Sequence, residues 1–362
     1  MPYYTPLRYP GGKRRLAPVV MRLLEENGLR NIEYVEPYAG GAAIALALLF
    51  EEHASTVHIN DLSRPVYAFW HSVLNESAEL CRRIERVRVT MREWHKQRAV
   101  YEHRAGADLA DLGFAALFLN RTNRSGIIAG GVIGGKHQTG EWALDARFNK
   151  GELVHRIRRI GRYRTRIKLY QMDALEFTNL VPSQLGRNTF LFYDPPYIEN
   201  GEDLYLNDYK IDDHLALASR VAKLEQPWVV TYDYAAIRAN IYPSCRRLVY
   251  GLNYSAHKRY EGREVMFLAD HVKTPPGWLR ARTIPMARSG NKHQVYGRME
   301  NMKTRPKTGE DPPPPDTTQE FATFTEVMKK LIAVPKQEID EQAEKWRRRK
   351  NKKKAPSRRI VS

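Results

Sequence analysis

Residues 34–74 constrain the fold more than any other part of the chain. Residues 34–37 predict a strand that includes Glu36, a glycine turn follows at Gly40, and an alanine- and leucine-rich helix continues through residue 50. Residues 56–61 predict a second strand that ends in Asp61, and residues 62–74 have the apolar spacing of a helix. A strand, a helix and another strand in this order are typical of a parallel α/β sheet.

Five later segments also predict strands, because they are short, apolar and rich in branched or aromatic residues. They are residues 167–172, 189–193, 228–232, 247–252 and 265–268. The last two flank a polar stretch, which predicts an antiparallel hairpin late in the sheet. We therefore expect an α/β fold with a Rossmann-like sheet.

Residues 77–166 interrupt this alternation. Residues 80–101 predict one basic helix, residues 114–120 have helical apolar spacing, and the glycine-rich residues 126–136 predict turns or a flexible hairpin. Residues 156–166 are densely basic. We interpret residues 77–166 as an insertion between the two parts of a core, residues 1–76 and 167–272.

The charge of the chain favours a polyanionic partner, most simply nucleic acid. Lysine and arginine number 59 against 41 aspartate and glutamate residues, a formal net charge of +18. Part of this excess lies in residues 273–362, a tail in which residues 345–359 hold ten basic and no acidic side chains. We expect the tail to be partly disordered, and either solvated or in contact with phosphates.

Composition argues against a secreted, membrane or metal-binding protein. Cys81 and Cys245 are too few for a disulfide framework or a metal site. The first residues lack the basic-then-apolar order of a signal peptide, and the apolar residues 42–50 are too few to span a bilayer. We expect a cytoplasmic protein that uses no metal.

Asp194-Pro195-Pro196-Tyr197 directly follows the apolar segment 189–193. Open α/β sheets bind ligands at the carboxyl ends of their strands, where this tetrapeptide is expected. Asp194 and the carbonyl group of Pro195 can accept the two hydrogens of an exocyclic amino group, which aims the nitrogen lone pair at an electrophile. Tyr197 can stack on a planar base. The alternative is an ordinary turn, for which Asp-Pro-Pro is equally suitable.

Glu36, Gly40 and Asp61 indicate a site for an adenosine-containing ligand. A glycine turn between a strand and its helix lets the backbone approach a ligand closely. An acidic residue about 20 positions later can bind ribose hydroxyls. Two alternatives stay open: the glycines can serve tight helix–strand packing, and Asp61 can cap a helix.

Asp173, Lys13 and Tyr9 each allow two interpretations. Asp173 follows the segment 167–172, where it can accept a hydrogen bond from an adenine amino group or cap the following helix. Lys13 and Tyr9 flank a Pro-Gly-Gly turn. Lys13 can neutralise a carboxylate and Tyr9 can face a cation; otherwise this is an ordinary turn near the start of the chain.

Five motifs, in this order, resemble the D12 class of DNA adenine-N6 methyltransferases, the Dam-like family, over roughly residues 5–272. The motifs are Arg8-Tyr9-Pro10-Gly11-Gly12-Lys13, Glu36-Pro37-Tyr38-Ala39-Gly40-Gly41, Asn60-Asp61, Leu119-Asn120-Arg121 and Asp194-Pro195-Pro196-Tyr197.

The resemblance implies S-adenosylmethionine as methyl donor, double-stranded DNA as partner, and a methyltransferase sheet whose insertion recognises the target. It implies in-line methyl transfer to N6 of a flipped adenine, because N6 is out of reach within the duplex. The catalytic residues it implies are Asp194, Pro195, Pro196 and Tyr197. The cofactor-binding residues it implies are Tyr9, Lys13, Glu36, Ala39, Gly40, Asp61, Asp173 and Asp194.

The insertion carries the residues that we predict to contact DNA. They are Asn120, Arg121, Arg124, Lys136 and His137. Family members that read GATC carry an aromatic residue, an asparagine and an arginine shortly after the Leu-Asn-Arg motif. In this chain Ala129 stands where that arginine is expected, so the resemblance does not predict GATC as the recognition sequence.

Other functions stay open at this point. An RNA or protein-amide methyltransferase is one alternative, although enzymes acting on amides usually carry Asn at the position of Asp194, and the basic insertion favours DNA. A non-catalytic DNA-binding relative is another alternative. The presence of all the key polar residues argues against it. We expect a monomer, either solitary or accompanied by a cognate restriction nuclease.

Overall fold

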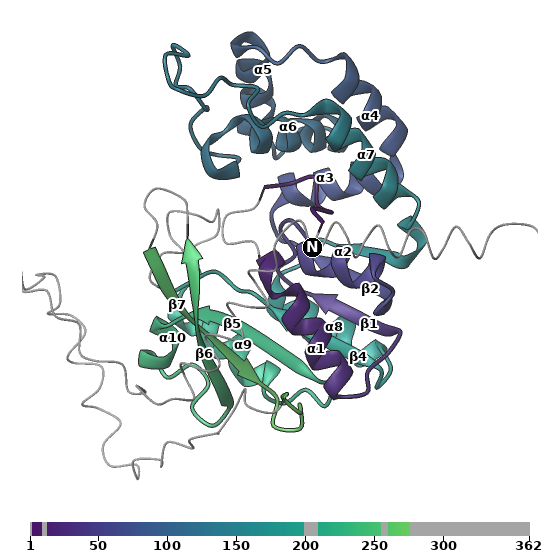
Figure 1. Cartoon of the computed structure of the whole chain (residues 1–362), viewed down its shortest axis with the longest axis vertical. Helices are drawn as coiled ribbons and strands as arrows, with labels where there is room; N and C mark the ends of the chain where they lie inside the picture. Colours follow the sequence, from purple (N-terminus) through teal and green to yellow (C-terminus); the bar gives the residue numbers. More distant parts are fainter. Residues whose placement is uncertain (1, 9–12, 199–208, 255–259, 276–362) are drawn as a thin grey trace, which may run out of the picture.

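The structure, a computed structural model, describes residues 2–8, 13–198, 209–254 and 260–275. In these residues one seven-stranded sheet organises the molecule, in the order β3-β2-β1-β4-β5-β7-β6 (Figure 1). The strands are β1 Ile32–Glu36, β2 Ala54–Asn60, β3 Ile167–Tyr170, β4 Thr189–Tyr193, β5 Trp228–Asp233, β6 Arg246–Tyr254 and β7 Tyr260–Leu268. The predicted α/β class is confirmed.

The strands β1 to β5 pair with one another in parallel. Every residue of β4 and β5 is buried. Parallel strands covered by helices on both faces have no solvent side, so their sequences are apolar throughout rather than alternating. This explains why residues 189–193 and 228–232 were recognisable as strands.

Helices connect the parallel strands and cover the sheet. They are α1 Ala17–Glu26, preceded by the 3-10 helix η1 Lys13–Leu16, then α2 Ala43–Phe50, α3 Arg64–Asn75, α8 Ala174–Gln184, α9 Ile211–Val221 and the short α10 Ala235–Arg238. Right-handed crossovers from β1 to β3 and from β3 to β5 run in opposite directions along the sheet, which places α2 and α3 on one face and α8 and α9 on the other. The winding therefore reverses between β1 and β4.

The predicted late hairpin is confirmed. β7 runs antiparallel to both β5 and β6. Both strands extend further toward their shared turn than the apolar residues alone indicated, because pairing continues to Tyr254 and Tyr260. As a consequence, the first part of β7 lies beside the carboxyl end of β5.

Between α3 and β3 the chain forms helices that gather at one end of the molecule, with α6 packed on α3 (Figure 1). They are α4 Ser77–Arg86, α5 Met91–Glu102, α6 Leu109–Thr122 and α7 Lys150–Gly161, with the short 3-10 helices η2 Arg124–Gly126 and η3 Arg164–Arg166. Their buried apolar residues join the same cluster as the sheet. The insertion is thus anchored through α3.

The prediction of one helix over residues 80–101 is wrong. α4 ends at Arg86 and α5 begins at Met91. The connection contains the β-branched Val87, Val89 and Thr90, which lose side-chain freedom in a helix. Thr90 adopts an extended backbone, and its hydroxyl accepts a hydrogen bond from the Glu93 amide, so it starts a new helix.

The glycine-rich segment forms turns, as predicted. An isolated antiparallel bridge joins Asn123 to Val132. Gly126 has φ +81°, and a Cβ atom there would lie 2.2 Å from the carbonyl oxygen of Arg8. Only glycine fits this close approach between the loop and the N-terminal segment.

Two predicted features, most of the tail and Tyr9, lie in parts of the chain that the structure does not describe. Residues 276–362, most of the predicted tail, and Tyr9 lie outside the described residues. Among the helices that the structure does describe, none is long and apolar enough to cross a membrane.

Candidate active site at the carboxyl end of the sheet

Three carboxyl groups lie at neighbouring strand ends. Glu36 ends β1, Asp61 directly follows β2, and Asp194 directly follows β4. Because β1 pairs in parallel with β2 on one side and β4 on the other, these ends lie side by side where the winding reverses. That position is the usual ligand site of an open α/β sheet.

The glycine turn after β1 is held by Asp61. The Gly40 amide donates to Asp61 Oδ2 at 2.9 Å, and the Gly40 carbonyl accepts from Trp70 Nε1 at 2.9 Å. Gly40 and Ala42 both have positive φ, +46° and +47°. The turn is therefore fixed in a left-handed conformation by its neighbours as well as by its glycine.

Asp61 is not the cap of α3, because Ser63 occupies that position. Its other oxygen, Oδ1, accepts from the Ser63 amide at 2.9 Å. Beside it, the buried Asn60 donates to the carbonyls of Pro37 and Met172, at 3.0 Å each. Asn60 thus links the carboxyl ends of β1, β2 and β3.

Burial dominates the protonation of the first two carboxyl groups. It raises the pKa of Glu36 well above its usual value, although the Ala45 amide donates to it at 3.3 Å. It raises the pKa of Asp61 to about 6, against the lowering effect of the Ser63 and Gly40 amides. A positively charged ligand would favour the ionised forms of both groups.

Asp194 is fixed from β5 and from η1. Its Oδ1 accepts from Thr231 Oγ1 at 2.8 Å and lies 3.5 Å from Lys13 Nζ. The pKa of Asp194 is raised to about 6, because burial and the negative charge of Glu264 outweigh the lowering effect of Lys13 and Thr231. Pro195 and Pro196 are buried, whereas Asp194 and Tyr197 are partly exposed. The tetrapeptide therefore presents one carboxylate and one ring from a rigid turn.

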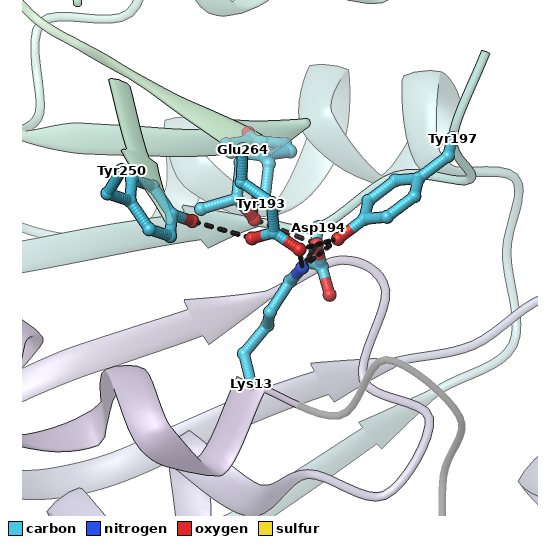
Figure 2. A network of polar contacts seen from close by, with 7 residues as sticks. Lys13, Tyr193, Asp194, Tyr197, Tyr250 and Glu264 are labelled. Carbon is cyan, nitrogen blue, oxygen red and sulfur yellow. Dashed lines mark hydrogen bonds and ion pairs between the residues drawn. The ribbon is translucent and has the colours of Figure 1, made fainter. Parts of the chain in front are cut away.

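Lys13 joins the tetrapeptide to a second buried carboxylate (Figure 2). Its Nζ lies 2.8 Å from Glu264 Oε1, bonds to the Tyr197 hydroxyl, and lies 4.7 Å from the centre of the Tyr197 ring. Burial lowers the pKa of Lys13, but Asp194 and Glu264 together outweigh it, so the pKa is raised and the ammonium stays charged. The predicted contact between Lys13 and a cofactor carboxylate stays a prediction.

Glu264 is the site residue that the sequence analysis missed. It lies on β7, is almost fully buried, and accepts from the hydroxyls of Tyr197 and Tyr250 as well as from Lys13. Only carboxylates that follow a strand were sought. In an antiparallel strand the residue that precedes the apolar run lies at the same edge, and Glu264 indeed pairs with Asp233 at the end of β5. Glu264 directly precedes the predicted strand 265–268. Together with the predicted antiparallel hairpin, this position could have indicated a carboxylate at the site.

Asp173 caps α8. Its Oδ1 accepts from the amides of Leu175 and Glu176, at 2.8 and 3.2 Å. The helix-cap interpretation is therefore what the structure shows, and contact with a cofactor stays a prediction, as it does for Ala39.

Asn120 does not lie where it could touch a base. It is fully buried; its amide nitrogen donates to the carbonyls of Arg8 and Gly126, at 2.7 Å each, and its oxygen accepts from the Arg8 amide at 2.8 Å. The structure corrects this predicted DNA contact. Asn120 instead ties the N-terminal segment to the start of the glycine-rich loop.

Arg121 belongs to a group of four arginines. Its Nε donates to the Arg147 carbonyl at 2.7 Å. Burial and the neighbouring charges of Arg156, Arg8 and Arg147 together lower the pKa of Arg121 to about 10. Several positive charges in one region favour an anion beside them.

Arg124, Lys136 and His137 are exposed on the segment that follows α6. Arg124 lines an open hollow of about 490 Å³ together with Gly134, Gly135 and the exposed Trp142. These three predicted DNA-binding residues are thus on the surface of the insertion, and their contacts with DNA stay predictions.

Comparison with known proteins identifies the family. A model of the family described as D12 class N6 adenine-specific DNA methyltransferase matches residues 9–258. The chain belongs to this family. It is therefore a methyltransferase of the adenine-specific DNA-methylating class, and methyltransferases of this kind generally use S-adenosylmethionine. None of the curated proteins matches the chain.

Two solved structures are similar over most of the chain. One is a conserved hypothetical protein from Streptococcus pyogenes, 10% identical over 70% of this chain and 97% of that one, with a TM-score of 0.29. The other is an rRNA methyltransferase from Streptomyces viridochromogenes, 13% identical over 72% and 86%, with a TM-score of 0.34. Similarity this low carries no information about the substrate.

Proposed function

We propose that this methyltransferase transfers a methyl group from S-adenosylmethionine to N6 of an adenine that is flipped out of double-stranded DNA. The observation that supports this most directly is the position of Asp194. It follows β4, beside the β1 end and the turn that Asp61 holds, so a base and a cofactor bound at this edge of the sheet would lie next to each other.

The residues around the glycine turn fit the proposed cofactor. Glu36 is buried and Asp61 is partly buried; both carboxyl groups have raised pKa values, and a ligand that carries positive charge complements them. Asp61 holds the turn through one lone pair of Oδ2, and each of its oxygens has a second lone pair that can accept a ribose hydroxyl. S-adenosylmethionine, when bound, supplies a methyl group on a positively charged sulfur.

Asp194 and Pro195 prepare the nitrogen. The Asp194 carboxylate accepts one N6 hydrogen and the Pro195 carbonyl the other, which draws the lone pair out of conjugation with the ring. Tyr197 stacks on the base and fixes its plane. Holding reactants in line can supply roughly 7–11 kcal/mol of the barrier.

One proton must leave N6 after the transfer. With a pKa of about 6, Asp194 is ionised at neutral pH and can take that proton before passing it to water. Thr231 and Lys13 keep the carboxylate in place during this exchange. We assign target recognition to the insertion, residues 77–166, because it presents Arg124, Lys136 and His137 on its surface.

Asp194→Ala tests this proposal. We expect loss of labelled-methyl transfer from S-adenosylmethionine to DNA, with an unchanged circular dichroism spectrum, because the variant removes the acceptor for N6. Asp212→Ala, at an exposed position of α9, is the matched control and should keep the wild-type rate.

The same assay on RNA and on protein separates the alternatives. Transfer to N6 of adenine in DNA, mapped by methylation-sensitive sequencing, supports the proposal and gives the recognition sequence. Transfer to RNA or protein alone contradicts it. Absence of S-adenosylmethionine binding in calorimetry would indicate a non-catalytic DNA-binding protein.

A further inference from the structure

Glu264 lies outside the five motifs and outside the residues that the family model matches, yet it is the least exposed charged group of the network around Asp194. Its side chain is 1% exposed. It reaches the site because β7 is antiparallel: Glu264 pairs with Asp233 on β5 and with Tyr250 on β6. β7 carries no residue that the sequence analysis assigned to the site, but its pairing with β5 and β6 places the Glu264 carboxylate in the network around Asp194.

Every oxygen of Glu264 accepts a hydrogen bond from a different element. Oε2 accepts from the Tyr250 hydroxyl at 2.8 Å, and Oε1 accepts from Lys13 Nζ at 2.8 Å and from the Tyr197 hydroxyl (Figure 2). A buried carboxylate is stable only with such partners. In return, the hydroxyl end of Tyr197 and the ammonium of Lys13 are held at one point.

We propose that Glu264 is a positioning residue for methyl transfer: it anchors the Tyr197 hydroxyl and holds Lys13 beside Asp194, so that the ring and the carboxylate meet the base in a fixed relation. This inference rests on the proposed function. Glu264 does not touch the reacting atoms; it acts through Tyr197 and Lys13.

The first consequence concerns Tyr197. Its ring can stack on a base only if its plane is set in advance, and the one polar atom of that ring bonds to Glu264 and Lys13. Loss of the Glu264 charge leaves this hydroxyl with a weaker acceptor. Small errors in the placement of a reacting group lower rates steeply.

The second consequence concerns the charge of Asp194. Lys13 Nζ lies closer to Glu264, at 2.8 Å, than to Asp194, at 3.5 Å, so the two carboxylates share one cation. The negative charge of Glu264 disfavours ionisation of Asp194, and Lys13 favours it. The groups that face Asp194 from all surrounding elements are Lys13 on η1, Tyr34 and Glu36 on β1, Thr231 and Tyr232 on β5, Glu264 on β7, and Tyr197 in its own turn.

Glu264→Gln tests the proposal in the full-length enzyme. The variant keeps the shape of the side chain and removes its charge. We expect kcat to fall on the order of 10- to 100-fold through misplacement of Tyr197 and Lys13. We also expect the acidic limb of kcat/KM to move to lower pH, since Asp194 loses a negative neighbour and its pKa falls.

Glu264→Asp separates the effect of the negative charge from the effect of side-chain length. It keeps the negative charge on a shorter side chain, so the rate should fall while the acidic limb stays close to its wild-type position. Glu225→Gln, an exposed position before β5, is the control and should change neither. A wild-type kcat together with a wild-type pH profile in Glu264→Gln overturns the proposal.

Two further measurements keep the inference testable. If Glu264→Gln does not fold, Tyr197→Phe replaces it, because this variant removes the anchored hydroxyl and leaves both charges; a wild-type kcat would overturn the anchoring role. Titration of the Asp194 carboxyl by ¹³C NMR, identified by its absence in Asp194→Asn, reports the coupling without any turnover. An inactive wild-type enzyme contradicts the proposed function, whereas an Asp194 pKa that is equal in wild type and Glu264→Gln contradicts the role of Glu264.

Discussion

Around Asp194 the ammonium of Lys13 lies between two carboxylates, whereas around Arg121 the neighbouring charges are mostly those of other arginines. Lys13 is shared between Asp194 and Glu264, and Thr231 and Tyr250 supply the remaining hydrogen bonds. Lys13 and Glu264 are buried, and the hydrogen bonds of this network form without a ligand. The network can therefore hold a fixed geometry before any substrate arrives.

The arginine group combines Arg8 of the N-terminal segment with three arginines of the insertion, and its positive charges outnumber the carboxylate beside them. Arg121 is surrounded by Arg8, Arg147 and Arg156, with Glu152 as the carboxylate that opposes them. A cluster of this kind is stabilised by a polyanion from outside. The contrast suggests that the sheet edge is organised for chemistry and the insertion for binding, and substitutions in each region should separate rate from affinity.

Lys13→Met should give the largest effect. It leaves the buried Glu264 and the partly exposed Asp194 without their shared cation, and removing one partner of a buried ion pair is strongly destabilising. We expect kcat to fall by at least about 100-fold and the acidic limb of kcat/KM to move to higher pH, because Lys13 lowers the pKa of Asp194. The DNA Kd should change little. A variant with weak DNA binding and normal kcat would break the comparison.

The strand-end carboxylates of the site around Asp194 could largely be predicted from the sequence. A parallel strand is a local apolar run, and the residue that follows it must lie at the carboxyl edge, so Glu36, Asp61 and Asp194 could be placed together without knowing the strand order. The partners of those residues were not readable. Glu264 and Thr231 reach the site only through the pairing of β7 with β5 and of β5 with β4, which depends on contacts between distant parts of the chain.

The insertion was less predictable for a related reason. Its helices lack a sheet to fix them, and the break at Thr90 depends on a single side-chain cap. Asn120 appeared as a polar residue next to Arg121 and was assigned to DNA. Its burial follows from the approach of Arg8 to Gly126, a contact between segments more than 100 residues apart that no local pattern reveals.

Gly126→Ala tests whether the contact between Arg8 and Gly126 supports DNA binding and not catalysis. The added Cβ atom would lie 2.2 Å from the Arg8 carbonyl oxygen, and φ is +81°, so the loop must move away from the N-terminal segment. We expect a loss of about 1–3 kcal/mol of stability and clearly weaker DNA binding, measured by thermal unfolding and fluorescence anisotropy. Gly131→Ala, where a Cβ atom meets nothing within 4 Å, is the control and should bind DNA normally.

Arg124→Ala should give the smallest effect and distinguishes two kinds of DNA contact. If Arg124 binds a phosphate, the slope of log Kd against log salt concentration should fall by about 0.9, equally for all DNA sequences. If it reads a guanine, affinity should fall by about 1–3 kcal/mol for the cognate site only, which relaxes specificity at one position. In both cases kcat at saturating DNA should stay at the wild-type value, because Arg124 lies on the insertion and not in the network around Asp194. Arg30→Ala, on the exposed turn before β1 at the opposite edge of the sheet, should leave both Kd and salt slope unchanged. A reduced kcat in Arg124→Ala would show that recognition and catalysis are coupled, and the separation drawn between the two regions would then be wrong.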